Sequence, residues 1–319
     1  MAIPEIEHAL SAYPWPYQAG KSNGKTVACL GAGPANLTLA VFLATEGYHI
    51  EIYEKEQQLG GAILTGIPSF RFDKSPLSKI REKMETLGIE FHFGVEVKPD
   101  EIPGLANRYD YLVLGIGAEK ENLAGQTLAP QVVGGLRLLR DVNVENKADE
   151  YMKYRHAYVW GGGNVALDCA RTLKRLIPEV TILYRRGEKE MPGNAIEIAE
   201  AKEEGVKFHL LHNLKELYYD DGGSLKGGNI VAMELGEPDE SGRASFHEIE
   251  GSLSFEPFDL FVLAIGEKPD GAYMPNHDGG YLFHDNIYVC GDARYGAKNV
   301  AAAICDGRTL AKLLLDTTN

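Results

Sequence analysis

The stretch TVACLGAGPANLTLAVFLATEGYHIEIYE, residues 26–54, decides the fold. It opens with a short apolar segment that runs into glycines, and it continues with apolar residues at helical spacing as far as Gly47. HIEIYE then has the composition of a second strand. A strand, a helix and a strand in this order form a βαβ unit, which indicates a parallel sheet.

The same organisation returns downstream. HAYVWGGG (residues 156–163) is a predicted strand that runs into glycines, NVALDCARTLKRL (164–176) has a helical apolar stripe, and VTILY (180–184) is the next strand. Between about 206 and 258, strand-like runs alternate with turns, which favours antiparallel hairpins. DLFVLAIG and NIYVCGDA are further buried strands, and NVAAAICDGRTLAKLLLD is a closing helix. The sequence therefore predicts an α/β protein with two Rossmann-like domains.

Bulk properties narrow the range of partners. The chain has 319 residues, which favours two domains. Asp and Glu (46) outnumber Lys and Arg (32), and the net charge of -14 argues against nucleic acid or an anionic membrane as partner. No apolar run reaches the roughly 20 residues of a membrane helix, and the first residues have no signal-peptide pattern. We expect a cytoplasmic protein.

Cysteine and histidine spacing gives no metal or redox motif. Cys29, Cys169, Cys290 and Cys305 are isolated, without a C-x-x-C pair, so we interpret the first three as packing residues. FHLLHN, with two histidines, fits no zinc motif. We therefore expect no metal site and no Ser/His/Asp arrangement.

The first glycine motif places Gly31, Gly33 and Asn36 at the three positions of G-x-G-x-x-G. The first glycine permits a tight turn, the second lets the backbone approach a pyrophosphate, and the third normally allows close helix–strand contact. Glu54 lies 23 positions after Gly31 at the tip of the next strand. An acidic residue there accepts hydrogen bonds from an adenosine ribose, although a solvated loop charge is the alternative.

The second motif has Gly161, Gly163 and Ala166, and the equivalent strand tip carries Arg185 followed by Arg186. A carboxylate at this position repels a 2′-phosphate, whereas a guanidinium binds one through charge-assisted hydrogen bonds. This favours NADP(H) at the second site, with an ordinary charged loop as the alternative. Two dinucleotide sites of different charge suggest a relay in which nicotinamide passes a hydride to a flavin. Such a transfer needs no catalytic side chain, because the chemistry belongs to the cofactors.

These motifs resemble the two-dinucleotide-binding flavoproteins that include glutathione reductase, in particular the small (β) subunit of NADPH-dependent glutamate synthase and the flavin half of dihydropyrimidine dehydrogenase. The resemblance rests on VACLGAGPANLTLA, LGGAILTGIPSFRF, WGGGNVALDCART, YRRGEKEMPG with AKEEGV, VLAIGEKP and YVCGDARYGAKNVAAAICDGR, and it covers about 26–319. It implies an NADP domain (120–255) inserted into a split FAD domain (25–119 and 256–319), after an N-terminal arm (1–24).

The resemblance also implies which residues bind FAD and NADP(H). Asp292 would bind the ribityl chain, the GIPSF loop would lie near the isoalloxazine, and the helix that begins near Asn299 would point at the flavin. Together with the glycine motifs, it gives these cofactor-binding positions: Gly31, Gly33, Pro34, Ala35, Asn36, Glu54, Lys55, Gly60, Gly61, Ile67, Gly115, Gly161, Gly163, Asn164, Val165, Arg185, Arg186, Gly266, Gly291, Asp292, Asn299 and Val300. Glu197 either contacts the nicotinamide or is a solvated helix charge.

Two departures from these families bear on function. The glutamate synthase subunit has iron–sulfur cysteines in a longer N-terminal segment, and thioredoxin reductases have a C-x-x-C before the second glycine motif; this sequence shows neither. We therefore expect an NADPH-dependent FAD oxidoreductase that passes electrons to an acceptor or partner subunit that the sequence does not identify. The alternatives are a stand-alone diaphorase or NADPH oxidase, and a subunit that binds FAD and NADP without turnover. No pattern indicates an oligomeric state.

Overall fold

The chain folds into two compact units, each with its own parallel sheet. The computed structural model describes residues 15–238 and 244–317, so most of the expected N-terminal arm lies outside the described residues. Unit 1 comprises Met1–Gly61, Lys74–Gly117 and Gly271–Asn319, and unit 2 comprises Ala62–Asp73 and Ala118–Asp270. Unit 2 is thus inserted into unit 1, and the predicted fold class is confirmed.

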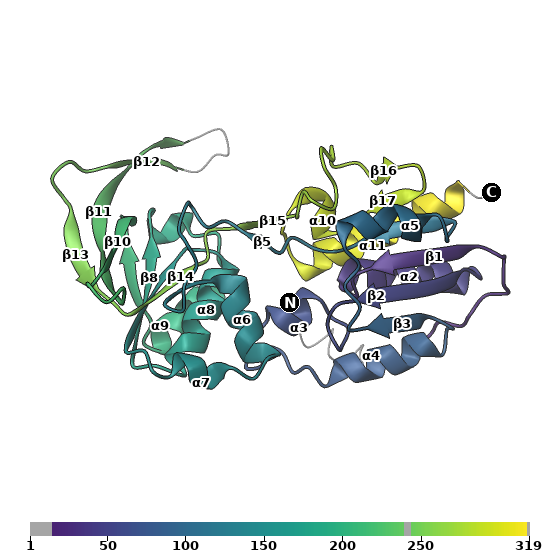
Figure 1. Ribbon diagram of the computed structural model, residues 1–319, viewed down its shortest axis with the longest axis horizontal. Coiled ribbons are helices and arrows are strands. Elements are labelled where there is room, and N and C mark those ends of the chain that lie inside the picture. Colours follow the sequence, from purple (N-terminus) through teal and green to yellow (C-terminus); the bar gives the residue numbers. More distant parts are fainter. Residues whose placement is uncertain (1–14, 239–243, 318–319) are drawn as a thin grey trace. The chain divides into compact units, whose positions relative to one another are not determined.

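Unit 1 contains a six-stranded sheet in the order β16-β17-β4-β1-β2-β3. All its pairings are parallel except β16–β17, and β1, β2 and β3 lie side by side (Figure 1). Its elements are β1 (Thr26–Leu30), α2 (Pro34–Thr45), β2 (His49–Glu54), α4 (Pro76–Glu85), β3 (Glu90–Phe93), η1 (Pro99–Glu101), α5 (Ile102–Ala106), β4 (Tyr111–Leu114), β16 (Leu282–His284), β17 (Ile287–Val289), α10 (Asp292–Tyr295) and α11 (Val300–Asp316).

Close packing of α2 on α11 supports the turn that leaves β1. Gly307 of α11 makes this possible, because a Cβ there would lie 2.1 Å from the carbonyl oxygen of Ala35. One face of the sheet packs on α5, through Ala28 and Leu30 against Leu105 and Ala106. Alternate strand residues thus face different layers, as the period of two requires.

Unit 2 contains a five-stranded parallel sheet in the order β6-β14-β7-β8-β9. Its elements are α3 (Ala62–Thr65), β5 (Lys120–Glu121), β6 (Val132–Gly134), α6 (Gly135–Asn143), α7 (Ala148–Tyr151), β7 (His156–Trp160), α8 (Asn164–Lys174), β8 (Glu179–Tyr184), η2 (Glu188–Glu190), α9 (Ala195–Glu203), β9 (Lys207–Leu210), β10 (His212–Tyr219), β11 (Leu225–Pro238), β12 (Ala244–Glu248), β13 (Ser254–Pro257), β14 (Leu260–Leu263) and β15 (Glu267–Lys268).

The two faces of this sheet pack on different layers. Val159 and Ile182 pack against residues of α6 and α8. Trp160 and Phe261, on the other face, pack against the antiparallel sheet of β10 to β13. The hairpins expected between about 206 and 258 are present, since β10, β12 and β13 all pair antiparallel with β11.

The compact units divide the chain at points other than the boundaries expected from the sequence. Unit 2 gives way to unit 1 at 270/271, whereas the sequence predicts the change from the NADP to the FAD domain at 255/256. The reason is β14, which pairs in parallel with β6 and β7 and so completes the sheet of unit 2. Residues 62–73, expected within the first FAD segment, also belong to unit 2.

An ion cluster holds the segment 62–73 to unit 2. The Arg71 guanidinium donates to both carboxylate oxygens of Asp168, at 2.7 and 2.6 Å, and it also pairs with Glu197. The two carboxylate side chains are only 7% and 10% exposed. Burial raises the pKa of Asp168 to about 6 despite the opposing effect of Arg71. Asn143 adds a hydrogen bond of 2.9 Å to the carbonyl oxygen of Thr65.

No helix within residues 15–238 or 244–317 combines the length and apolarity needed to cross a membrane.

We predict that Arg71→Ala lowers the free energy of unfolding by about 3 kcal/mol at pH 8, because it leaves two buried carboxylates without their cation. The loss should be smaller at pH 5. The folded-state pKa of Asp168, about 6, already lies above its unfolded value, and the loss of Arg71 raises it further. The stability of the variant therefore falls as the pH rises from the unfolded pKa to the folded pKa of Asp168. Urea unfolding at both pH values measures this. A matched control is Arg81→Ala, which removes an exposed ion pair with Glu85 and should have little effect; equal losses for the two variants would contradict the prediction.

Candidate dinucleotide-binding sites

The first glycine loop joins β1 to α2 in unit 1, and its two glycines differ in what the fold demands of them. Gly31 has φ +91°, and a Cβ there would lie 2.7 Å from the Gly115 carbonyl oxygen, so the fold itself excludes a side chain. Gly33, the N-cap of α2, has φ -82°, and the nearest atom to an added Cβ is 3.9 Å away. Nothing in the fold requires glycine at this second position. It leaves a space beside the helix N-terminus, which a pyrophosphate needs for close approach.

Asn36 occupies the third motif position because Gly115 makes room for its side chain. Its Nδ2 donates to the carbonyl oxygens of Leu30 and Gly31, each at 2.8 Å, and the residue is fully buried. A Cβ at Gly115 would lie 2.4–2.5 Å from the Asn36 side chain. Asn36 therefore braces the turn from within, and Gly115 takes the role that a glycine at the third position has in the usual motif.

Glu54 stands at the end of β2 and is not a solvated loop charge. It is 4% exposed, and its two carboxylate oxygens accept from the backbone N–H groups of Ala32 (2.6 Å) and Glu56 (2.8 Å). Burial raises the pKa of this carboxyl, and the two backbone hydrogen bonds oppose that effect. Each carboxylate oxygen has a second lone pair, so two acceptor positions remain for a ribose. Lys55, the next residue, is exposed.

Two further segments of unit 1 lie against the first glycine loop. Gly60 N–H donates to the Ala32 carbonyl oxygen at 2.8 Å. Gly61 has φ +52°, and a Cβ there would lie 2.9 Å from the Cα of Gly33. At the other end of the chain, Gly291 has φ +65°, and its added Cβ would lie 2.8 Å from the Cβ of Ala35. The structure thus brings residues near 60, 115 and 291 to the loop at 31–36.

Asp306 positions the turn at Gly291 and was missed by the sequence analysis. It is 6% exposed and accepts from Gly291 N–H (2.7 Å), the Tyr281 hydroxyl (2.8 Å) and the Arg294 guanidinium. The available signal was a carboxylate beside Gly307 in a helix with an apolar stripe. Asp292, next to this turn, accepts from Lys298 N–H at 3.3 Å, and burial raises the pKa of its carboxyl. Asn299 caps α11 through Ala302 N–H at 2.8 Å, so Val300 is the first helical residue.

The second glycine loop, between β7 and α8 in unit 2, repeats the arrangement. Gly161 has φ +150°, and a Cβ there would lie 2.0 Å from the Ala264 carbonyl oxygen and 3.3 Å from the Cβ of Ala166. Gly163 has a negative φ of -89°, and its added Cβ would meet only Pro192, at 3.9 Å. As in the first loop, it is the second glycine that leaves a space beside the N-terminus of the helix. Residues of both loops therefore fit a bound dinucleotide.

The residues that follow the second loop make contacts within unit 2. The Asn164 side chain accepts from Asn194 N–H at 2.9 Å, which joins the starts of α8 and α9. Val165 packs near Gly135 of α6. Gly266 has φ +117°, and its carbonyl oxygen accepts from Asn122 N–H at 2.9 Å.

The two arginines that follow β8 differ in burial. Arg185 is exposed, whereas Arg186 is 3% exposed and its Nε donates to the Ala244 carbonyl oxygen at 2.6 Å. Both guanidinium groups lie over the ring of Phe246, at 4.4 and 4.9 Å from its centroid. The two guanidinium groups therefore share one aromatic ring, and the two arginines differ in how far they are buried. Arg185 is the arginine that solvent, and hence a ligand, reaches.

The structure also gives the contacts and burial of Ile67, Glu197 and three of the cysteines. Ile67 follows α3 in unit 2, where its N–H donates to the Ala62 carbonyl oxygen at 3.1 Å. Glu197 is 8% exposed and pairs with Arg71, so it is not a solvated helix charge. Cys29, Cys169 and Cys290 are buried, and burial raises the pKa of Cys29 to about 12, which fits packing rather than thiolate chemistry.

Comparison with known proteins identifies the family. The model of the pyridine nucleotide-disulphide oxidoreductases matches residues 25–307. The chain belongs to this family. It is 33% identical to the glutamate synthase [NADPH] small chain of Halomonas elongata over 92% of this chain and 68% of the relative. The resemblance stated from the sequence is therefore confirmed.

Two further proteins add to this assignment. The chain is 34% identical to the NADP(+)-dependent formate dehydrogenase subunit beta of Moorella thermoacetica over 91% of this chain, and it spans 43% of that relative. The structure of Mycobacterium tuberculosis FprA in complex with NADPH aligns with a TM-score of 0.79 at 18% identity, over 92% of this chain and 84% of that chain, and so shares the fold. The family model and these relatives thus place the chain in a family of pyridine nucleotide-dependent oxidoreductases that bind FAD and NADP(H).

The pairing of Asn36 with Gly115 predicts strong coupling between the two positions. Gly115→Ala should lower the free energy of unfolding by about 1–3 kcal/mol, because the new Cβ overlaps the Asn36 side chain. In an Asn36→Ala background, which removes the overlapping atoms, the same change should cost much less. A double-mutant cycle by urea unfolding measures the coupling. Additive effects of the two changes would show that Gly115 does not accommodate Asn36.

Proposed function

We propose that the chain is the electron-input part of a larger assembly, with FAD bound in unit 1 and NADPH bound in unit 2. The observation that carries this proposal is the pair of glycine loops with opposite charges at the adjacent strand tips. A buried carboxylate, Glu54, follows the first loop, and an exposed guanidinium, Arg185, follows the second. A carboxylate suits a free ribose, and a guanidinium suits a 2′-phosphate.

In this proposal the residues of unit 1 hold FAD. The space outside Gly33 and the positive end of α2 receive the pyrophosphate, and Glu54 accepts from the ribose. Asp292, beside the turn at Gly291, binds the ribityl chain. When bound, the flavin would supply the redox chemistry, which is hydride acceptance from a nicotinamide and electron release to an acceptor. The protein contributes binding and orientation.

The residues of unit 2 hold NADPH in the same way. The space outside Gly163 and the N-terminus of α8 receive the pyrophosphate, and Arg185 binds the 2′-phosphate. Arg186 supports this tip from the inside, since its guanidinium is anchored on β12.

A separate protein subunit is the acceptor in this proposal. The relatives from Moorella and Halomonas are named as a subunit and a small chain of larger enzymes. The chain spans less than half of the length of the Moorella relative. Such an assembly would receive electrons from the FAD-binding unit of this chain.

Gly33→Ala and Gly163→Ala form a matched pair that tests the two binding sites. Both positions have negative φ and no protein atom closer than 3.9 Å to the new Cβ, so both variants should fold with nearly unchanged stability. Gly33→Ala should lose FAD during purification. Gly163→Ala should retain FAD and have a KM for NADPH raised roughly tenfold, the order of one lost charge-assisted contact. Flavin content and steady-state kinetics with a dye acceptor measure both effects, and loss of FAD from Gly163→Ala alone would reverse the assignment.

Arg185→Ala should raise the KM for NADPH by roughly tenfold or more, since it removes a charge-assisted hydrogen bond to the 2′-phosphate. The KM for NADH should change much less, because NADH has no 2′-phosphate. Arg81→Ala, on the surface of unit 1, is the control and should leave both constants unchanged. An equal effect of Arg185→Ala on the two coenzymes would remove the basis for NADP specificity.

A further inference from the structure

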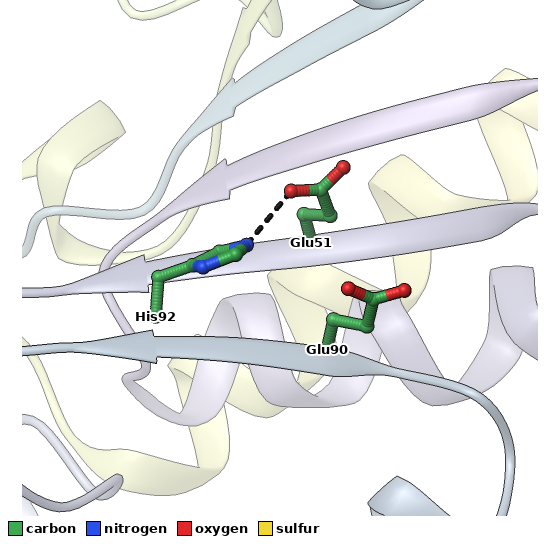
Figure 2. A group of neighbouring side chains, drawn as sticks. All are labelled: Glu51, Glu90 and His92. Atoms are coloured by element: carbon green, nitrogen blue, oxygen red, sulfur yellow. Dashed lines mark hydrogen bonds and ion pairs between the residues drawn. The ribbon is translucent and has the colours of Figure 1, made fainter.

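A group of histidines and glutamates lies on one face of β2 and β3, apart from both glycine loops. β2 begins with His49, Ile50 and Glu51, and β3 begins with Glu90, Phe91 and His92. The two strands therefore carry the patterns H-x-E and E-x-H. Because side chains alternate along a strand, the histidine and glutamate of each pattern share a face. Figure 2 shows Glu51, Glu90 and His92 extending to the same side of the two strands.

The parallel register brings the two patterns together. Glu51 is the register partner of Glu90. One ligand atom from each of Glu51, Glu90 and His92 lies within 4.8 Å of the others. His49 lies outside this group of three, but its Nε2 is close to the two carboxylates, at 3.6 Å from Glu51 Oε1 and 3.7 Å from Glu90 Oε1.

These separations suit the coordination shell of a first-row transition metal. Zn–N and Zn–O bonds of about 2.0–2.2 Å place neighbouring tetrahedral ligand atoms roughly 3.4 Å apart. The distances from His49 to the two carboxylates are within a few tenths of an ångström of this value. His92 Nε2 now lies 2.7 Å from Glu51 Oε2, joined by a proton that a metal would replace.

Charge gives a reason for a cation at this place. Two glutamates that are register partners on neighbouring strands repel each other and destabilise the pair. A divalent cation between Glu51 and Glu90 would turn the repulsion into attraction.

Neighbouring tyrosines already orient two of the ligands. The Tyr53 ring stacks on the His92 ring, with centroids 4.6 Å apart. The Tyr53 hydroxyl donates to Glu51 Oε2 at 3.1 Å, and it lies 2.7 Å from the Tyr109 hydroxyl. Outer contacts of this kind fix the orientation of ligands in metal sites.

We propose that Glu51, Glu90 and His92 form a binding site for a divalent transition metal, which His49 completes as the fourth ligand, with Zn²⁺ as the best match. Two imidazoles and two carboxylates are donors that zinc accepts, whereas Mg²⁺ and Ca²⁺ prefer oxygen alone. The side chains of His49 and Glu90 are 46% and 58% exposed, so a metal can reach them from solvent. β3 is the edge strand of the sheet, and the metal would fasten it to β2.

Calorimetric titration of ZnCl₂ into the full-length, FAD-loaded chain tests this proposal. The titration uses protein without a histidine tag. The substitution Cys305→Ser removes the exposed thiol as a competing ligand. We expect a single Zn²⁺ to bind and the unfolding temperature to rise with Zn²⁺ concentration, because the metal binds the folded state. MgCl₂ should give no comparable binding.

Variants locate the binding. His49→Ala and Glu90→Gln, which change well exposed side chains, should each weaken Zn²⁺ binding roughly tenfold or more. His284→Ala is the matched control: His284 Nδ1 lies 2.7 Å from Asp285 in an exposed pair of the same unit, and its loss should leave Zn²⁺ affinity unchanged. The proposal is overturned if the parent protein does not bind Zn²⁺, or if His49→Ala and Glu90→Gln both bind Zn²⁺ as tightly as the parent protein.

Discussion

In both units, the turn that carries the glycine motif, from β1 to α2 and from β7 to α8, passes so close to a neighbouring strand end that no side chain fits. Gly31 lies against the carbonyl oxygen of Gly115, which follows β4, and Gly161 lies against that of Ala264, which follows β14. β4 neighbours β1, and β14 neighbours β7, so the two contacts are equivalent in the two sheets. The rest of each candidate site depends on this approach, because it directs the helix N-terminus past the sheet edge.

The two loops differ in the residue that packs at the third motif position. The second loop has Ala166 at the third motif position, a small residue that packs beside Gly161. The first loop has Asn36, which hydrogen-bonds to the strand end and requires Gly115 as its complement. The strand tips differ as well, since Glu54 is tied to its own loop and Arg185 is exposed. The same strand–turn–helix arrangement thus has a carboxylate at the adjacent strand tip in unit 1 and a guanidinium in unit 2.

Local patterns in the sequence were sufficient for the elements that build these loops. HIEIYE is β2 to the residue, and the closing helix was expected at the place of α11. Apolar periodicity and glycine are local signals, and a βαβ unit needs little else. The motif positions around 31–36 and 161–166 were identified for the same reason.

Features that depend on pairing between distant segments were not predictable. The sequence of β14 does not say which sheet it joins, and only its pairing with β6 and β7 places it in unit 2. Arg71 meets Asp168 across 97 positions, and Gly115 meets Asn36 through the neighbouring strand. The patterns H-x-E and E-x-H also become one cluster only in the register of β2 with β3. In each case the chemistry lies in a contact that no sequence window contains.

Anaerobic titration of the purified, FAD-loaded protein with NADPH, and separately with NADH, tests the central claim most directly. Without oxygen, electrons that reach the flavin stay there, so the visible flavin band reports the transfer. The account predicts that stoichiometric NADPH bleaches the band and that NADH at the same concentration does not. A flavin that stays oxidised under NADPH, or that responds equally to both coenzymes, would contradict it.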